Sequence, residues 1–509
     1  MSFYVTTPIY YVNGEPHLGH AYSTIAADIL ARHHRQRGDQ VFFLTGTDEH
    51  GEPVAQQAEA ESVTPRELGD RLAPRFKEMA AKINASNDFF IRTTDEGHMN
   101  RVQEIVQRVY DNGHVYEGMY EGWYCPRCAD FKTESELGPD NTCPIHQIPL
   151  TRESQRNWFF ALSKFQGDLE KLYEERPGFV IPEFRKNEAL AFIKQGLQDV
   201  SLSRPTLKWG VPVPWDTDQV IYVWFDALLN YYTALGYGAD EDVTEAFWPP
   251  FHILAKDILK FHAVYWPAFL MAAGIEVPER MFIHGYLLME GHKMSKSLGN
   301  VLDPDEVIDK FGADALRFYC FREVSFGQDG QISPAGFESR YESELADQYG
   351  NLANRVLSMI GRYRDGTVPD AEAEPELAGD FEGAPDRIRS KLDDAELTQA
   401  LEEIWKLIRR LNQYVEETRP WELAKQEPGP DHPERAMRCA QLDSVLYGLA
   451  EGLRVTTLLL HAYMPETTGR LLEALSETDR ELAEFGSRRG GQSLGELAPL
   501  FPKLAPERA

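Results

Sequence analysis

Two short motifs far apart in the chain carry side chains suited to binding a triphosphate. The first is His17-Leu18-Gly19-His20, which follows an apolar run at residues 3–5, and the second is Lys293-Met294-Ser295-Lys296-Ser297. Residues three apart share one face of a helix, so His17 and His20 lie together at a helix start, where the backbone dipole favours anions. Imidazole and ammonium groups stabilise the negative charge that develops as a triphosphate reacts. A histidine pair in the core with an unrelated basic loop is the plainer alternative.

Three of the five cysteines lie in one stretch with a histidine. Cys125-Pro-Arg-Cys128 and Cys143-Pro-Ile-His146 are two pairs with matched two-residue gaps. Three thiolates and one imidazole are a preferred tetrahedral set for zinc, and four protein ligands leave no position for a catalytic water. We therefore predict one structural zinc per chain. Buried unpaired cysteines do not account for the matched gaps, and the histidine that ends the second pair argues against a redox dithiol.

The elements that position the histidine motif alternate between strand and helix. We expect strands at 3–7 and 40–45, a helix at 18–37, and a helix that starts with the capping box Thr64-Pro65-Arg66-Glu67. Strand, helix, strand in this rhythm predicts a parallel sheet, whose ligands bind outside the carboxyl ends of the strands. The histidine motif and the segment 46–51 both follow strands, so we expect them to meet in one crevice.

Later segments predict an insertion and a helical end. Residues 115–220 carry the cysteine cluster and several prolines, which indicates an inserted subdomain. Strands are expected to resume at 220–224 and 281–284, and an acidic first turn starts a helix at 303–306. From about 338 the pattern predicts helices only, with linkers near 366–388 and 426–434. The apolar stretch 445–464 contains Glu451 and Arg454, which indicates a buried amphipathic helix and not a membrane span.

Length and composition limit the classes of protein to which the chain can belong. A chain of 509 residues is too long for one ordinary core, and an apolar fraction of 42% is ample for packed domains. No secretory signal pattern is seen at the start, and few cysteines indicate a reducing, cytoplasmic location without membrane contact. The net charge of −29 argues against nonspecific binding to polyanions. Total charge does not decide, however, whether one local groove is basic.

Six segments, taken together, resemble the methionyl-tRNA synthetases among the class I aminoacyl-tRNA synthetases. They are Pro8-Ile9-Tyr10-Tyr11-Val12-Asn13-Gly14, Gly46-Thr47-Asp48-Glu49-His50-Gly51, the two cysteine pairs, Val223-Trp224-Phe225-Asp226-Ala227, Lys256-Asp257-Ile258-Leu259-Lys260-Phe261-His262 and the lysine motif. The resemblance covers residues 1–425 in order. The leucine, isoleucine and valine enzymes carry a larger insertion, for which this chain has no room.

The resemblance implies roles for individual residues. The methionine-binding residues are expected to be Ile9, Tyr11, Asp48, Trp224, Tyr231, Phe261 and His262, with Asp48 on the amino group. The ATP-binding residues are expected to be His17, Gly19, His20, Asp257, Lys293 and Lys296, of which both histidines and both lysines are catalytic. The anticodon-reading trio is expected to be Asn351, Arg355 and Trp421. Ala255 stands where the family usually has glycine.

The implied fold is a class I Rossmann-type parallel-sheet domain with an inserted zinc-binding subdomain and an α-helical bundle at the C-terminus. We expect residues 1–114 and 221–290 to form its two halves, 115–220 the zinc insertion, 291–338 the lysine-loop region and 339–509 the anticodon-binding domain. The implied reaction activates L-methionine with Mg-ATP and transfers it to tRNA(Met), initiator and elongator alike. The expected partners are thus methionine, ATP and tRNA, and a monomer is expected because no appended β-barrel module follows.

Two other functions remain open on the sequence alone. One is a class I synthetase for another small amino acid such as cysteine, which pyrophosphate exchange with a panel of amino acids would separate. The other is a paralogue that binds tRNA or nucleotide without charging it. The intact histidine and lysine motifs argue against this second alternative, since a binder needs neither.

Overall fold

The computed structural model describes residues 1–125, 130–132, 134–145, 147–236, 241–289, 292–293, 303–427 and 432–503. The chain divides into two compact units. The first unit contains Met1–Ala27, Gln40–Ala81 and Ala85–Gly285, and the second contains Asp28–Asp39, Lys82–Asn84 and Tyr286–Ala509.

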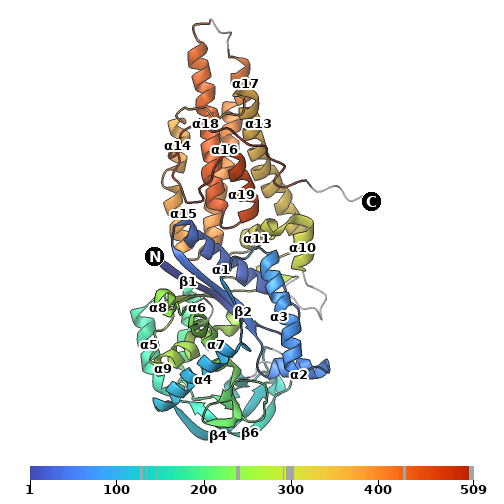
Figure 1. Ribbon diagram of the computed structural model, residues 1–509, viewed down its shortest axis with the longest axis vertical. Helices are drawn as coiled ribbons and strands as arrows, with labels where there is room; N and C mark the ends of the chain where they lie inside the picture. Colours follow the sequence, from blue (N-terminus) through green and yellow to red (C-terminus); the bar gives the residue numbers. More distant parts are fainter. Residues whose placement is uncertain are drawn as a thin grey trace. The chain divides into compact units, whose positions relative to one another are not determined.

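The centre of the first unit is a six-stranded parallel sheet in the order β3-β2-β1-β12-β13-β7 (Figure 1). Its strands are β1 (Ser2–Tyr11), β2 (Gln40–Asp48), β3 (Phe89–Arg92), β7 (Val180–Ile181), β12 (Phe251–Ala255) and β13 (Arg280–His284). The order changes direction between β1 and β12, as in doubly wound folds, and ligands of such sheets bind at that point beyond the carboxyl ends. The predicted parallel-sheet class is confirmed.

Helices pack against this sheet in two hydrophobic clusters. The helices of the first unit are α2 (Glu52–Ala60), α3 (Pro65–Lys82), α4 (Glu96–Asp111), α5 (Gln166–Glu175), α6 (Glu183–Lys194), α7 (Val223–Thr233), α8 (Thr244–Phe247) and α9 (Trp266–Ala273), together with the start of α1 (Leu18–Gln36). Helices α4, α7 and α9 contribute to the larger cluster, and α2 and α3 to a smaller one with Tyr10 and Val12. The capping box before α3 is confirmed: Thr64 N–H donates to Glu67, and Glu67 N–H donates to Thr64 Oγ1.

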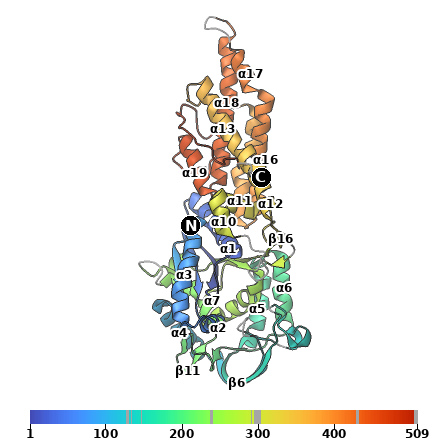
Figure 2. The ribbon, with the colours of Figure 1, turned by 90° about the vertical axis from the view of Figure 1, so that its right-hand side faces the viewer.

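Two antiparallel sheets come from the part of the chain that the sequence marks as an insertion. One has the order β5-β4-β6-β8, with β4 (Val115–Cys125), β5 (Asp130–Lys132), β6 (Thr151–Phe160) and β8 (Val200–Ser201). Strand β6, labelled in Figure 2, pairs with β4 along its whole length. The other has the order β10-β11-β9, with β9 (Ser203–Arg204), β10 (Pro212–Val213) and β11 (Asp216–Ile221). Strand β7 from the same stretch joins the edge of the parallel sheet.

The expected strand at 220–224 is wrong beyond Ile221. Strand β11 ends at Ile221 and is antiparallel, and helix α7 begins at Val223. Most of α7 is buried, and its sequence is mainly apolar, with Asp226, Asn230 and Thr233 as the exceptions. Hydrophobic periodicity does not separate such a buried helix from a buried strand. Trp224 therefore lies on the first turn of a helix.

The second unit is mainly helical. Its helices are α10 (Pro304–Phe311), α11 (Ala313–Arg322), α12 (Pro334–Arg340), a π-helix (Tyr341–Gly350), α13 (Asn351–Tyr363), α14 (Pro375–Phe381), α15 (Ala384–Asp393), α16 (Leu397–Thr418), α17 (Pro420–Lys425), α18 (Arg435–Leu460) and α19 (Pro465–Ala474). A small sheet has the order β15-β14-β16, with β14 (Leu287–Met289), β15 (His292–Lys293) and β16 (Gly330–Gln331). The expected linker at 366–388 is wrong from residue 375, because α14 and the start of α15 bury apolar residues there.

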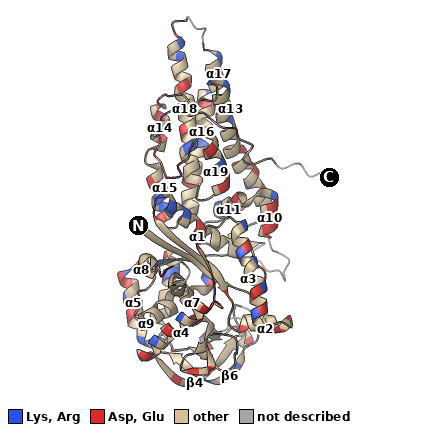
Figure 3. Ribbon diagram, in the orientation of Figure 1, with Lys and Arg blue, Asp and Glu red and all other residues tan. Residues whose placement is uncertain are grey.

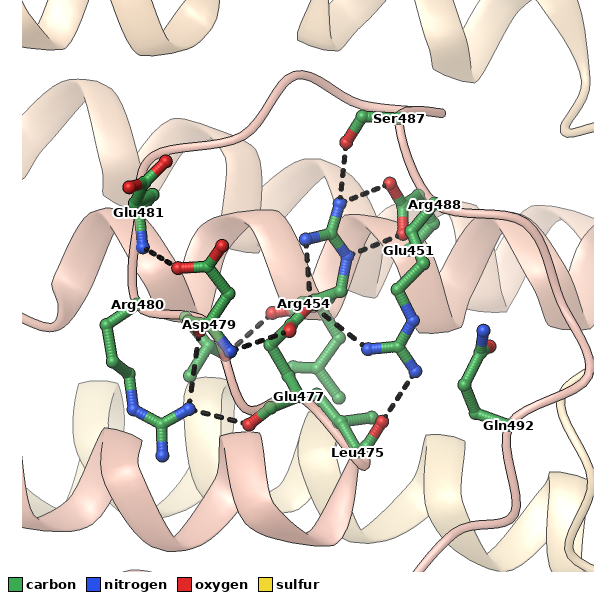
Figure 4. A network of polar contacts seen from close by, with 12 residues as sticks. Glu451, Arg454, Leu475, Glu477, Asp479, Arg480, Glu481, Ser487, Arg488 and Gln492 are labelled. Atoms are coloured by element: carbon green, nitrogen blue, oxygen red, sulfur yellow. Dashed lines mark hydrogen bonds and ion pairs between the residues drawn. The ribbon is translucent and has the colours of Figure 1, made fainter. Parts of the chain in front are cut away.

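Buried ion pairs hold the second unit together. Arg317 is fully buried, lies 2.7 Å from the Asp28 carboxylate and donates to the carbonyls of Ile83, Ala462 and Tyr463. A second network joins α18 to the segment after α19: Arg454 forms a bidentate pair with Glu451 and also contacts Glu477 (Figure 4). On the helical surface, acidic and basic residues are interspersed (Figure 3). Every charge inside these networks has an opposite partner, which is the condition for burying it.

Among the helices of the described residues, none combines the length and the hydropathy that crossing a membrane requires.

Candidate active site

The two histidines of the first motif stack at the start of α1. Their rings lie 3.8 Å apart between centroids at an angle of 23°. The backbone N–H of Gly19 donates to His17 Nδ1, and that of His17 donates to His20 Nδ1. A side chain added at Gly19 would place its Cβ 2.9 Å from His17 Cε1, so only glycine lets the imidazole fold over the helix end. Nδ1 of each ring thus accepts a backbone hydrogen bond, which places the proton of a neutral imidazole on Nε2.

Aromatic packing fixes the second imidazole. The His20 ring lies 4.6 Å from the Tyr10 ring and 5.2 Å from the Phe76 ring, measured between centroids. The Tyr10 hydroxyl donates to the His20 carbonyl oxygen at 3.1 Å. Burial raises the pKa of Tyr10 to about 12, so this hydroxyl keeps its proton at neutral pH. The His20 imidazole is therefore held rigidly. A rigid donor suits a triphosphate site, since it needs no reorganisation during reaction.

Asp48 is a buried carboxylate at the carboxyl end of β2. It is 4% exposed, and it forms no ion pair with Lys, Arg or His in the part of the chain that the structure describes. Burial raises the pKa of Asp48 well above its usual range, and the charges of Asp226 and Glu49 add to this. The backbone N–H of His50 approaches its Oδ1 at 3.4 Å and opposes the shift. A carboxylate in such surroundings is stabilised by a cationic ligand.

The neighbour of Asp48 is held rigidly. Glu49 accepts from Arg92 Nε at 2.6 Å and from Arg92 Nη2 at 2.8 Å. The hydroxyls of Thr47 and Thr94 donate to the same carboxylate. A Cβ at Gly69 would lie 2.9 Å from Glu49 Oε2, so the glycine leaves room for this arrangement. The backbone on either side of Asp48 therefore has little freedom.

An aromatic wall lies on α7 and on the segment after β12. The rings of Trp224 and Phe261 stack at 3.7 Å with an interplanar angle of 4°. Trp224 Nε1 is buried and has no hydrogen-bond partner among the described residues. Ile9 and Tyr11, at the end of β1, are half-buried against the same hydrophobic cluster. Stacked rings with one unsatisfied donor suit a flexible apolar ligand that has a few polar atoms.

A neutral polar pair completes the wall. Tyr231 Oη and His262 Nε2 lie 2.9 Å apart, and His262 Nδ1 lies 3.1 Å from the Ile258 carbonyl. A carbonyl only accepts, so Nδ1 carries the proton and Nε2 accepts from the Tyr231 hydroxyl. Burial lowers the pKa of His262 to about 4 and raises that of Tyr231. Neither group carries charge at neutral pH, which fits a ligand side chain that is itself uncharged.

The expected nucleotide-binding residues fall partly within the described chain. Asp257 follows β12 at the carboxyl edge of the sheet and is exposed. The backbone of Lys293 is in β15, which pairs with β14. Lys296 and the side chain of Lys293 lie outside the described part of the structure.

The structure describes half of the expected metal-ligand set. Cys125 ends β4 and Cys143 lies after it, and both are fully buried. The buried core of this small region consists of these two cysteines and Leu150. Cys128 and His146 lie outside the described residues, and among the residues described no three His, Cys, Asp or Glu side chains form a metal-binding group. A region with so small a core fits stabilisation by a metal.

The expected anticodon residues lie in the second unit. Asn351 is the first residue of α13, and Arg355 lies one turn later. The Arg355 guanidinium lies 5.7 Å from the Trp421 ring centroid, and its Nη2 lies 2.7 Å from Glu416 Oε1. Arg355 and Trp421 are therefore in contact. The basic residues of α16, in contrast, are each paired with an acid, as in Arg409–Glu402 and Arg410–Asp380.

Comparisons with known proteins agree with this geometry. The family model "tRNA synthetases class I (M)" matches residues 3–155 and 140–357. The methionine–tRNA ligase of Caldanaerobacter subterraneus subsp. tengcongensis is 42% identical, over 100% of this chain and 80% of the relative. The chain belongs to the methionine–tRNA ligase family. The enzyme of Streptomyces coelicolor is also 42% identical, over 99% of this chain and 97% of the relative.

Solved structures of the methionine–tRNA ligase family have the same fold. The Mycobacterium tuberculosis methionyl-tRNA synthetase in complex with methionyl-adenylate has a TM-score of 0.93 and 40% identity, covering 98% of this chain and 99% of that chain. The apo form from the same organism has a TM-score of 0.87 and 36% identity, covering 99% and 98%. Family membership favours a methionine-charging enzyme over a cysteine-charging enzyme and over a paralogue that does not charge tRNA.

Sequence reasoning missed a buried group beside the site. Asp226, on α7, lies 2.7 Å from His50 Nδ1 and 2.8 Å from His98 Nε2. Asp226 and His50 lie in two of the six segments that resemble the family, but His98 lies on α4, far from both in sequence. An acidic residue within the apolar run of α7 was the available signal, because a buried charge requires partners.

Proposed function

We propose that this chain activates L-methionine with ATP to form methionyl-adenylate and then transfers the methionyl group to tRNA(Met), both initiator and elongator. The observation that carries the proposal is the buried Asp48 carboxylate, which has no cationic partner among the described residues and lies in the family's amino-acid-binding motif. An amino acid supplies the missing cation through its ammonium group. Specificity for methionine follows from the chemistry of the adjacent wall.

The proposed methionine site combines one charged contact with an apolar slot. Its residues are Ile9, Tyr11, Asp48, Trp224, Tyr231, Phe261 and His262. Methionine is flexible and polarisable, and its sulfur interacts favourably with aromatic rings such as the stacked Trp224 and Phe261. Because Tyr231 and His262 are neutral, a charged side chain would be buried there without a counter-charge, which disfavours it.

For ATP we propose His17, Gly19, His20 and Asp257 with Lys293 and Lys296. The methionine carboxylate attacks the α-phosphorus of ATP, and pyrophosphate leaves. Rigid donors at the start of α1 support this role for the histidines, since they stabilise charge on the phosphates mainly by positioning and electrostatics. Magnesium bound to ATP offsets part of the phosphate charge. The terminal ribose hydroxyl of tRNA then attacks the adenylate carbonyl carbon, and AMP leaves.

The second unit is proposed to recognise the tRNA. Its residues 339–509 form the proposed anticodon-binding domain, in which Asn351, Arg355 and Trp421 read the anticodon. The proposed catalytic halves are 1–114 and 221–290, with 115–220 as the zinc insertion and 291–338 as the lysine-loop region. One chain carries every residue assigned here, so the proposal includes a monomer, acting in the cytoplasm where tRNA is charged.

Replacing Trp421 by Ala is expected to separate the two half-reactions. Methionine activation should stay within about twofold of wild type, while kcat/KM for tRNA charging should fall by roughly 10-fold or more, since stacking on one base contributes about 1–3 kcal/mol. Pyrophosphate exchange and tRNA acylation, measured on one preparation, check this. Trp405→Phe is a useful control, because Trp405 is a fully buried core residue of the same unit. Equal loss in both half-reactions for Trp421→Ala contradicts the anticodon assignment.

One zinc per chain is expected, held by Cys125, Cys128, Cys143 and His146. A closed shell of three thiolates and one imidazole stabilises a region with little core of its own. Cys125→Ser is expected to lose the zinc, whereas Cys320→Ser, at a buried cysteine in α11, should keep it. Metal analysis of both purified variants decides this. Absence of zinc from wild type, or full retention by Cys125→Ser, would contradict the assignment.

The proposal as a whole is tested by charging of tRNA. The purified chain, ATP and labelled methionine are expected to give methionyl-tRNA with transcripts of both initiator and elongator tRNA(Met). A transcript with a changed anticodon is the control, and its acylation should fall strongly. Acylation with cysteine in place of methionine, or binding of tRNA without any charging, would overturn the proposal.

A further inference from the structure

A network of buried hydrogen bonds connects the segment that carries Asp48 to helix α7, which carries Trp224 and Tyr231. These are two parts of the proposed methionine site. Asp226 on α7 is fully buried and contacts His50 Nδ1 at 2.7 Å and His98 Nε2 at 2.8 Å. His98 Nδ1 lies 2.7 Å from the hydroxyl of Thr233, near the end of α7. His50, at 3% exposure, and His98, at 0%, are as inaccessible as the carboxylate between them.

The hydrogen bonds of Asp226, His50 and His98 define where the protons of these three groups lie. Burial alone would raise the pKa of Asp226, but the charge of His50 and the hydrogen bonds from both histidines outweigh it and lower that pKa to about 2. Asp226 is therefore a carboxylate that only accepts hydrogen bonds. It follows that His50 Nδ1 and His98 Nε2 both carry protons and donate to it.

Two members of this hydrogen-bond network, His50 and Asp226, lie close in sequence to residues that we propose to bind the ligand. His50 is two residues after Asp48, and its backbone N–H approaches Asp48 Oδ1. Asp226 is two residues after Trp224 and five before Tyr231 on the same helix. The carboxylate thus joins the segment that carries the ammonium-binding group to the helix that carries the walls of the side-chain slot.

A second contact fixes the same segment from the other side. The indole N–H of Trp209 donates to the Glu49 carbonyl oxygen at 2.5 Å, and its ring lies 5.3 Å from the His50 ring. Together with the Arg92 clamp on Glu49, this contact fixes the backbone of the segment, while the hydrogen bond to Asp226 fixes the His50 ring.

The energetic cost of the arrangement indicates a role beyond stability. Burying an ionised carboxylate with two imidazoles carries a desolvation penalty, and apolar residues of similar volume often give equal or greater stability. Asp226 also adds to the raised pKa of Asp48, so it disfavours the ionised form of that residue in the empty site. What Asp226 does supply is directional hydrogen bonding to two different elements.

We propose that Asp226 is a positioning residue for methionine recognition, which through His50 holds Asp48 at the correct distance from Trp224 and Tyr231, with His98 fixing its carboxylate. This inference rests on the proposed function, because it assumes that Asp48 binds the ammonium of methionine. His98 is the informative position: it contacts Asp226 and Thr233 and is not one of the residues assigned to the methionine slot.

The test compares His98→Ala and Asp226→Asn with wild type in pyrophosphate exchange. Both are expected to raise KM for methionine by about 10-fold or more, as small displacements of binding groups do, with KM for ATP changed less than about twofold. His98→Gln should recover most of the loss, because its amide can place an N–H near the Nε2 position. If His98→Ala does not fold, Asp226→Asn alone still decides the test.

A control separates positioning from general stability. Glu451→Gln breaks a buried ion pair with Arg454 in the second unit, so it should lower the unfolding temperature and leave both KM values unchanged. If His98→Ala and Asp226→Asn behave like Glu451→Gln, the inference is overturned while the proposed function stands. If wild type shows no methionine-dependent exchange, the proposed function fails, and this inference fails with it.

Discussion

Asp48→Asn is expected to raise KM for methionine at least about 100-fold and to leave KM for ATP nearly unchanged. The substitution keeps the size of the side chain but removes the charge that pairs with the ammonium group. A charge-assisted hydrogen bond in a buried site contributes about 1.5–3 kcal/mol, and leaving the ligand ammonium unpaired adds a desolvation cost. Pyrophosphate exchange at varied methionine concentrations measures the effect. An unchanged KM would contradict the assignment of Asp48.

The same variant should be more stable than wild type without ligand. The pKa of Asp48 is raised in the folded protein, so the folded state binds more protons than the unfolded state at pH values above the ordinary aspartate pKa. Stability contributed by this group therefore falls as pH rises through that window. Asparagine does not titrate, so the gain of Asp48→Asn should be larger at pH 7.5 than at pH 4.5. We expect an increase of about 2 °C or more in the unfolding midpoint at pH 7.5.

A second buried aspartate provides the matched control. Asp28 is fully buried like Asp48, but its carboxylate lies 2.7 Å from Arg317 and 2.7 Å from Arg32. Asp28→Asn leaves a buried guanidinium without its counter-charge, so it should destabilise the protein strongly. Opposite signs for Asp48→Asn and Asp28→Asn in thermal unfolding are the expected result. Destabilisation by both would mean that Asp48 is a structural residue.

Lys296→Ala is expected to lower kcat for adenylate formation by about 100-fold or more and to change KM for methionine little. The ammonium group is proposed to act on phosphate charge that develops in the transition state, and losing such an interaction lowers kcat and kcat/KM equally. Lys310→Ala is the control, since Lys310 is an exposed lysine of α10 that pairs with Glu338. Exchange at the wild-type rate in Lys296→Ala would mean that the lysine motif is not catalytic.

Local sequence signals predicted those helices and strands whose start or type depends on neighbouring residues alone. The capping box at Thr64 begins α3 at Pro65, and the Asp303 side chain accepts from Asp305 N–H at the start of α10. Alternating strand and helix patterns predicted β1, α1 and β2, although β1 and β2 extend further than expected, to Tyr11 and Asp48. These extensions carry residues that we propose to bind the ligands, Ile9, Tyr11 and Asp48, beyond the apolar runs.

Elements decided by distant partners were not predictable in the same way. Strand β12 exists because Phe251–Ala255 pairs with both β1 and β13, and its short run was not recognised. The strand expected at 220–224 ends at Ile221, and Val223 and Trp224 instead begin the buried helix α7. The link from Asp226 to His98 joins residues 128 apart in sequence, which no local pattern contains.

The central claim is that Asp48 and the aromatic residues assigned with it bind methionine for activation by ATP. ATP–pyrophosphate exchange without tRNA, run with each of the twenty amino acids and the purified chain, tests this claim most directly. Methionine is expected to support exchange at least about 100-fold more efficiently in kcat/KM than cysteine, leucine or any other natural amino acid, and Asp48→Asn should remove most of that exchange. Exchange that depends on a different amino acid, or on none, would contradict the account.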